Sequence, residues 1–134
     1  QFEGFMEIEL QVDQDLMRRE RTDRRLISDE VKLAAYRIAE EALTNVVKHS
    51  KASKVTVKLD MPSPEWIQLS VKDNGQGFDP ENVAAGMGIV GMRDYAEAMG
   101  GGCSIHRDKD QGTEVSVRLP VATPAPVRPQ SASL

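Results

Sequence analysis

Polar side chains with a possible chemical use recur at helical spacing within residues 28–49: Glu41, Asn45, Lys48 and His49. At about 100° per residue they lie along one edge of the apolar arc of the predicted helix, with Asn45 and His49 practically inside it. The arc consists of Val31, Ala35, Ile38 and Ala42. A buried amide without a partner costs about 1–3 kcal/mol. Two interpretations stay open: a polar network that caps the helix end, or a pocket in which Asn45 offers its carbonyl oxygen to Mg²⁺ and Lys48 meets an anion.

A second polar group, Asp73-Asn74-Gly75-Gln76-Gly77-Phe78, comes directly after a predicted strand. Gly75 and Gly77 would let the backbone approach a flat ligand closely. The carboxylate of Asp73 can accept a hydrogen bond from an exocyclic amine. The same residues are also typical of an ordinary Asp-Asn-Gly turn. Alone, this segment therefore indicates a candidate site and nothing more specific.

The run Gly86-Met87-Gly88-Ile89-Val90-Gly91 matches the G-x-G-x-x-G pattern of dinucleotide-binding proteins, with Asp108 near the place of the ribose-binding acid. That pattern requires a buried strand immediately before it, whereas residues 79–85 are those of a polar loop, so we reject the dinucleotide interpretation. Exposed main-chain amides at the start of the following helix would still bind an anion. Thr113, before the final strand, is either a turn residue or a second hydrogen-bonding group for a base.

The elements that must position these groups follow from hydrophobic periodicity. Alternation predicts strands at residues 5–12, 55–59, 66–71, 103–107 and 114–119, and helical spacing predicts helices at 28–48 and 89–99. The face of the first strand expected to be buried comprises Met6, Ile8, Leu10 and Val12, and the charged segment 13–25 is expected to be a loop. Because strands follow one another in pairs, we expect an α+β fold: a two-layer α/β sandwich with a mixed, mostly antiparallel sheet and helices on one face.

Composition narrows the class of protein. A length of 134 residues with 40% hydrophobic residues suits one domain, which we assign to residues 1–120, and residues 121–134 are expected to form a disordered C-terminal tail. A net charge of -4 with scattered basic residues predicts no nucleic-acid contact. The absence of a long apolar run predicts no membrane contact by this domain. We expect a cytoplasmic fragment, starting at Gln1, of a parent that could itself be membrane-anchored.

Taken together and in this order, the segments resemble the GHKL, or HATPase_c, superfamily: gyrase B subunits, MutL, heat-shock chaperones and histidine kinases. Residues 41–49 look like its N box, residues 73–78 like its G1 box and residues 86–93 like its G2 box. Gly112-Thr113 looks like its final element. The residues of these boxes are similar to those of sensor histidine kinases of the nitrate-sensor and DesK type, although Glu40 stands where that subclass usually has Gln. Glu40 is expected to face solvent. The resemblance covers residues 26–120 and implies the Bergerat ATP-binding fold.

The resemblance also implies roles for individual residues. The implied ATP-binding residues are Asn45, Lys48, His49, Asp73, Gly75, Gly77, Gly86, Met87, Gly88, Ile89 and Thr113. Asn45 would coordinate Mg²⁺, and Asp73 would recognise the adenine amino group with support from Thr113. Gly86 and Gly88 would bound a flexible lid over the phosphates. Glu41, the implied catalytic residue, would orient or deprotonate the histidine that accepts the phosphoryl group.

The implied activity is transfer of the γ-phosphate of Mg-ATP to a histidine on a separate helical dimerisation domain, expected before Gln1. The downstream partner would be a response regulator with a LuxR-type DNA-binding domain. Because neither His49 nor His106 suits the acceptor role, the chain alone is expected to bind Mg-ATP without autophosphorylating. The alternatives are another GHKL ATPase, an anti-sigma serine kinase, or a pseudokinase that binds ATP without transfer.

Overall fold

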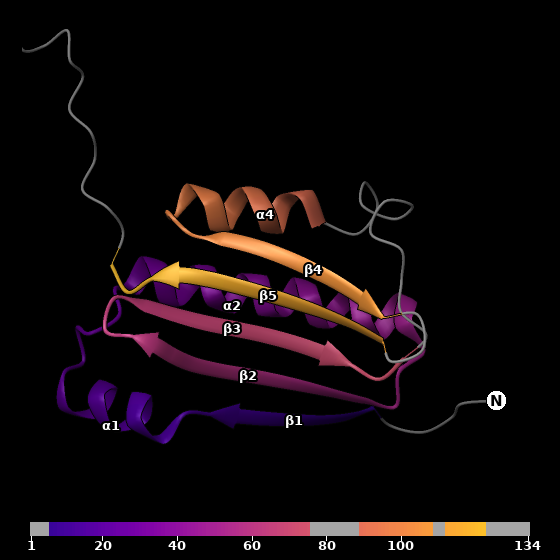
Figure 1. Cartoon of the computed structure of the whole chain (residues 1–134), viewed down its shortest axis with the longest axis horizontal. Helices are drawn as coiled ribbons and strands as arrows, with labels where there is room; N and C mark the ends of the chain where they lie inside the picture. The colour runs from indigo at the N-terminus through magenta and orange to yellow at the C-terminus, as the bar shows by residue number, and fades with distance from the viewer. Residues whose placement is uncertain (1–5, 76–88, 109–111, 123–134) are drawn as a thin grey trace, which may run out of the picture.

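The computed structural model describes residues 6–75, 89–108 and 112–122. One layer is a five-stranded sheet in the order β1-β2-β3-β5-β4 (Figure 1). The strands are β1 (Glu7–Val12), β2 (Lys54–Ser63), β3 (Trp66–Asp73), β4 (Gly102–Asp108) and β5 (Gly112–Pro120). β1 pairs with β2 in parallel and the other pairs are antiparallel, which confirms the predicted mixed, mostly antiparallel sheet.

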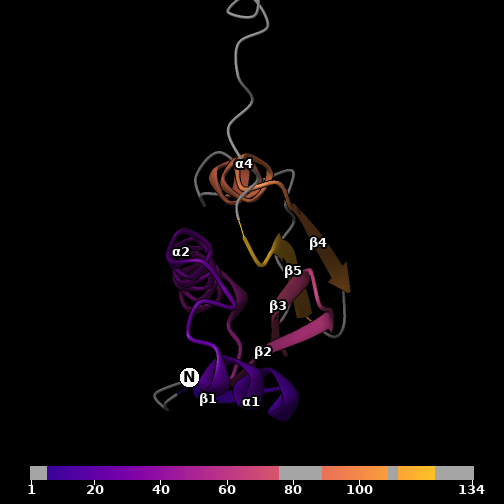
Figure 2. The same ribbon diagram turned by 90° about the vertical axis from the view of Figure 1, so that its left-hand side faces the viewer.

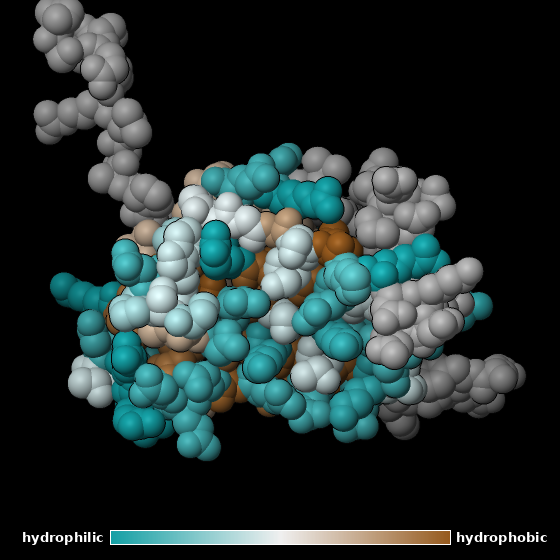
Figure 3. All heavy atoms as spheres, viewed as in Figure 1, coloured by the Kyte–Doolittle hydropathy of each residue, from teal (hydrophilic) through white to brown (hydrophobic). Residues whose placement is uncertain are grey.

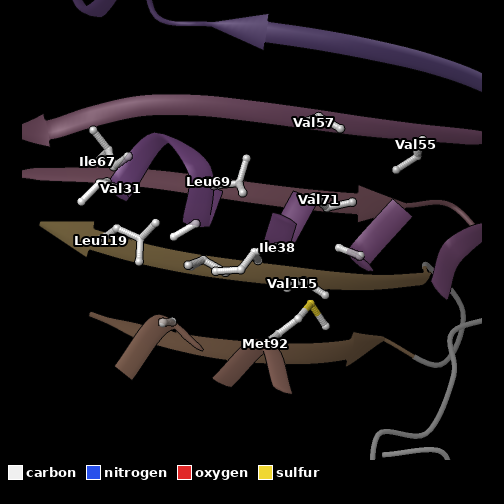
Figure 4. Close-up of a cluster of buried hydrophobic side chains, with 14 of the residues drawn as sticks. Val31, Ile38, Val55, Val57, Ile67, Leu69, Val71, Met92, Val115 and Leu119 are labelled. Carbon is white, nitrogen blue, oxygen red and sulfur yellow. The ribbon is translucent and has the colours of Figure 1, made fainter. Parts of the chain in front are cut away.

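Helices α2 (Asp29–Asn45) and α4 (Ile89–Ala98) form the second layer. The π-helical η1 (Val46–Ser50) continues α2, and α1 (Gln14–Thr22) follows the end of β1 at the edge of the sheet (Figure 1). Figure 2 shows α2 and α4 on the same side of the sheet. In the core between the layers, Ile38 of α2 and Met92 of α4 lie over valines of the strands such as Val71 and Val115 (Figure 4). This arrangement confirms the predicted two-layer sandwich. In the described ranges, no helix is long and apolar enough to cross a membrane.

The uncovered face of the sheet is polar. Viewed as in Figure 3, it is mostly hydrophilic, with little apolar surface between the polar side chains. Gln68 Nε2 donates a hydrogen bond to Ser116 Oγ at 3.3 Å across β3 and β5. The guanidinium of Arg118 lies 4.5 Å from the ring centre of Trp66. Such a face needs no second helical layer.

Helix α2 begins where the sequence predicts. Ser28 is its N-cap, and its hydroxyl accepts a hydrogen bond from the Val31 amide at 3.2 Å. The residues buried on its core face are Val31, Ala34, Ile38, Ala42 and Asn45, whereas Ala35, predicted for this face, is half-buried. The regular α-helix ends at Asn45 and continues to Ser50 as η1, close to the predicted end at residue 48.

The loop predicted for residues 13–25 is wrong, because most of it is helix α1. Asp13 is the N-cap, with Oδ2 accepting from the Leu16 amide at 3.1 Å. Asp15 forms ion pairs with Arg18 and Arg19 at helical spacing. Leu16 alone of this helix is buried, so the segment shows no apolar period. A cap and local charge pairs support this helix, and periodicity does not reveal them.

The burial predicted for β1 is also wrong, although the strand itself is confirmed. Ile8 and Leu10 are 56% and 66% exposed. Their pairing with Val55 and Val57 places them on the side of the sheet that faces the core. However, α2 packs on β3 and β5, nearer the middle of the sheet. The alternation identifies the inward side of β1 correctly, but this edge strand lies beyond the part of the sheet that α2 covers.

Val121, the first residue of the predicted tail, is hydrogen-bonded through its main chain. Its amide donates to the Glu65 carbonyl at 2.9 Å and its carbonyl accepts from the Ser28 amide at 2.8 Å. Val121 therefore joins the start of α2 to the β2–β3 turn. Residues 123–134, the rest of the predicted tail, lie outside the described residues.

Candidate functional site

Three of the predicted site residues lie at one end of the molecule. Figure 1 shows the C-terminal end of α2, the end of β3 and the start of β5 at the same end of the sandwich. These positions hold Asn45, Asp73 and Thr113, each only 2% exposed. In the described ranges they make up the whole set of buried polar side chains. Burial of polar groups has a free-energy cost, so their concentration at one end makes this end the candidate site.

Asp73 is held in place by its own turn. It is the last residue of β3 and pairs with Val55 of β2. Its Oδ1 accepts a hydrogen bond from the Gly75 amide at 2.8 Å, as in an Asx turn. The ordinary-turn interpretation and the binding interpretation of this segment are thus compatible: the turn orients one carboxylate oxygen of a buried Asp.

Gly112 allows β5 to pass close to Asp73. Its φ is +98°, a backbone conformation that favours glycine. A Cβ at this position would overlap the Asp73 carbonyl oxygen and would lie 2.8 Å from Asp73 Oδ1. The absence of a side chain at Gly112 therefore brings Thr113 beside the end of β3. Sequence reasoning named Gly112 only as part of a motif, and its contact depends on strand register.

Asn74, to which the sequence alone assigns no role, links the turn after β3 to the start of β2. Its Oδ1 accepts hydrogen bonds from the amides of Ser53 and Lys54, each at 3.0 Å. Its Nδ2 donates to Ser53 Oγ at 3.0 Å, and its own amide donates to the Lys54 carbonyl at 3.1 Å. The turn after β3 is thus tied to the start of β2, a few residues after the end of η1. The sequence feature that could have indicated this linking role is the polar residue in the middle of an Asp-Asn-Gly turn.

Asn45 has an unused hydrogen-bonding group. Within the part of the chain that the structure describes, its Nδ2 has no hydrogen-bond partner although the side chain is buried. Leaving such a group unpaired costs about 1–3 kcal/mol. This favours the binding-pocket interpretation of the helix end over a self-contained capping network, because a ligand could satisfy the amide.

Glu41 lies on the side of α2 that faces α4. It is half-buried and, together with Arg37, Met92 and Tyr95, lines a cavity of about 300 Å³. Lys48 is exposed in η1. A carboxylate in such a cavity can act on a group brought from outside.

The structure describes the remaining predicted site residues only in part. The backbone of His49 belongs to η1 and Ile89 is the first residue of α4, but their side chains are not described. Gly77, Gly86, Met87 and Gly88 lie outside the described residues. Their assignment to the phosphate side of the site stays a prediction.

Comparison with known families identifies the class of protein. The model of the HATPase_c family, described as histidine kinase-, DNA gyrase B- and HSP90-like ATPases, matches residues 30–123. The chain belongs to this family, in which the matched domain binds ATP. Asn45, Asp73 and Thr113 all lie in the matched range.

Curated relatives narrow the class to sensor kinases. The chain is 40% identical over 96 residues to the sensor histidine kinase LiaS of Bacillus subtilis, covering 71% of this chain and 26% of LiaS. It is 39% identical over 95 residues to the nitrate/nitrite sensor protein NarX of Escherichia coli, covering 69% of this chain and 16% of NarX. The chain therefore resembles the nitrate-sensor type, as predicted, and matches about a quarter or less of the length of these relatives.

Solved structures support the fold. The blue-light activated histidine kinase of Erythrobacter litoralis is similar with a TM-score of 0.65 at 18% identity, covering 98% of this chain and 38% of that one. The ATP binding domain of PrrB from Mycobacterium tuberculosis is similar with a TM-score of 0.54 at 24% identity, covering 72% and 68%. The sandwich is thus the fold of histidine-kinase ATP-binding domains.

Proposed function

We propose that this chain binds Mg-ATP at the end of the sheet that holds Asn45, Asp73 and Thr113. We further propose that it is the catalytic domain of a sensor histidine kinase. The observation that carries this proposal is the burial of these three polar side chains at one end of the molecule, since they are all the buried polar side chains of the described residues. Bound there, ATP would supply the γ-phosphoryl group and Mg²⁺ would neutralise charge on its phosphates.

Each buried residue has a group that suits the nucleotide. Asp73 would accept a hydrogen bond from the adenine amino group, with its carboxylate oriented by the Gly75 amide. Thr113 would add a hydroxyl beside it. Asn45 would hold Mg²⁺ through its amide oxygen, and its unpaired Nδ2 would donate to a phosphate oxygen.

The acceptor is proposed to lie on another domain of the parent. Glu41, in the cavity between α2 and α4, would orient or deprotonate a histidine supplied by the dimerisation domain. Lys48 and His49 would lie near the phosphates. A response regulator, of the LuxR type by resemblance, would then receive the phosphoryl group, and the parent would place this domain in the cytoplasm.

The first test replaces the proposed adenine-binding carboxylate. Asp73→Asn should abolish ATP binding in calorimetry, because the amide presents a donor where the adenine amino group needs an acceptor. Asp60→Asn is the matched control, since Asp60 lies towards the other end of β2. Normal ATP affinity in folded Asp73→Asn would contradict the adenine assignment.

The kinase part of the proposal has its own test. The chain, mixed with the parent's dimerisation domain and labelled ATP, should transfer the label to that domain, and the chain alone should remain unlabelled. Steady ATP turnover without any acceptor would instead favour a hydrolytic GHKL ATPase. Label on serine would favour a serine kinase, and ATP binding without transfer would indicate a pseudokinase.

A further inference from the structure

Strand β1 is an edge strand whose outer side has no neighbouring strand among the described residues. It pairs with β2 alone, in parallel. The amides of Glu7 and Asp13 both donate hydrogen bonds toward the β2 side, at 2.9 Å each. The direction of main-chain groups alternates along a strand, so the odd-numbered residues of β1 face β2. The amides and carbonyls of the even-numbered residues Ile8, Leu10 and Val12 therefore point outward.

The residues that present these outward groups also have apolar side chains. Ile8 and Leu10 are 56% and 66% exposed, and Val12 is half-buried. The three side chains lie on the side of the sheet that faces the helices, but α2 packs on β3 and β5 and leaves them uncovered. Unpaired main-chain groups beside an apolar row form a template for another strand. This edge therefore indicates a surface that accepts an added strand.

The sequence of β1 is complementary to itself about Leu10. If a second copy pairs antiparallel about a two-fold axis at this residue, Leu10 faces its own copy and Ile8 faces Val12. These positions exchange main-chain hydrogen bonds, because the outward groups of both strands meet there. On the other face of the sheet Glu9 comes opposite Gln11. The two side chains suit each other, since Gln11 Nε2 donates to Glu9 Oε2 at 2.8 Å within one chain.

Charge selects this register over the neighbouring one. With the axis at Glu9, each Glu9 would face its own copy across the joined edges, and like charges directly opposite destabilise a sheet. Lys54, which pairs with Glu9 at 2.9 Å, belongs to β2 and does not lie between the two copies. With the axis at Leu10, the like-charged pair is Glu7 with Asp13. Asp13 follows the end of β1, and its carboxylate caps α1.

We propose that two copies of this chain associate through their β1 edges into one continuous sheet, with the two-fold axis at Leu10. This inference does not depend on nucleotide binding. β1 begins at the end of the sheet where β3 ends at Asp73 (Figure 1). Antiparallel pairing therefore places the two candidate nucleotide sites at opposite ends of the joined sheet. A contact made by one short strand is small, so the association should be weak and should depend on concentration.

Sedimentation equilibrium of the 134-residue chain at concentrations up to about 1 mM should show a monomer–dimer equilibrium. Leu10→Lys should weaken the dimer about tenfold or more, because two ammonium groups would meet at the axis. Leu10→Pro should do the same, because it removes an outward amide that β2 does not use. Leu33→Lys is the matched control, since Leu33 is an exposed leucine on α2, and it should leave the dimer unchanged.

Cross-linking tests the register. In a Cys103→Ala background, which removes the free cysteine, Leu10→Cys should form an intermolecular disulfide under mild oxidation. The reason is that facing residues of paired strands have their Cα atoms about 5.5 Å apart. A mixture of Ile8→Cys and Val12→Cys chains should also cross-link, whereas Ile8→Cys alone should not. Val47→Cys is the control, because Val47 is 66% exposed, as Leu10 is, but lies in η1.

Three results would overturn the proposal. One is a wild-type chain that stays monomeric over the whole concentration range, including a monomer that co-sediments with anionic vesicles. Another is a dimer that folded Leu10→Lys leaves intact. The third is cross-linking of Leu10→Cys that is no faster than that of Val47→Cys. Thermal unfolding midpoints of the variants show whether each chain is folded under the conditions of the measurement.

Discussion

At the scale of single residues, the site depends on how neighbours present the carboxylate of Asp73. One oxygen is oriented by the Gly75 amide, and the main chain is approached closely by Gly112. Gly75 and Gly112 thus position the Asp73 carboxylate through their backbone alone. The proposed recognition of adenine needs a buried acceptor in a defined direction, so backbone geometry at Gly112 should matter in addition to the carboxylate itself.

This predicts a specific effect of adding one methyl group. Gly112→Ala should lower ATP affinity about tenfold or more, equivalent to about 1.4 kcal/mol, because the new Cβ would displace Asp73. Gly101→Ala is the control: its Cβ would overlap the Arg118 carbonyl oxygen, away from the buried polar residues. Both variants should unfold at lower temperature, but titration below their midpoints should show weakened binding only for Gly112→Ala. Equal ATP affinities of the two variants would contradict the positioning role of Gly112.

At the scale of elements, the site is assembled where several of them end. α2 ends at Asn45, β3 ends at Asp73, and β5 begins at Gly112. The side chain of Asn74 links the end of β3 to the start of β2 through three hydrogen bonds. Local links of this kind keep separate segments in register where no regular ladder remains.

Removal of that link should affect binding as well as stability. Asn74→Ala should lower the unfolding free energy by about 0.5–1.5 kcal/mol and also weaken ATP binding, since the turn carrying Asp73 is released. Asp13→Ala removes a helix cap of about 1 kcal/mol from α1 and is the matched control. Calorimetric titration of both should show loss of affinity for Asn74→Ala alone. If Asn74→Ala is destabilised but binds ATP normally, the link has only a structural role.

The sequence predicted those elements whose stability comes from periodic burial. The arc from Val31 to Ala42 indicated α2, and alternation indicated all five strands. α1 was missed because a cap at Asp13 and ion pairs hold it, with one buried residue. The exposure of Ile8 and Leu10 could not be predicted, since it depends on which strands α2 packs over. Within the site, residue types indicated Asn45 and Asp73, but the contact of Gly112 depends on register between distant strands.

At the scale of the whole molecule, the sandwich separates two surfaces. One end holds Asn45, Asp73 and Thr113, where the proposed nucleotide would bind (Figure 1). The outer side of α2, where Tyr36 and, in the continuation η1, Val47 are exposed, runs along the same helix that ends at Asn45. Helix α2 thus reaches the proposed nucleotide site with its C-terminal end and exposes apolar side chains along its length.

The central claim is that the nucleotide binds where the three buried polar residues meet. Amide resonances of the isotope-labelled chain, followed by NMR during titration with a non-hydrolysable ATP analogue and Mg²⁺, test it directly. The account predicts saturable shifts at Asn45, Gly75 and Thr113, with the amides of Leu10 and Glu65 unmoved. Absence of saturable shifts at the three site residues, or shifts confined to the open face of the sheet, would contradict it.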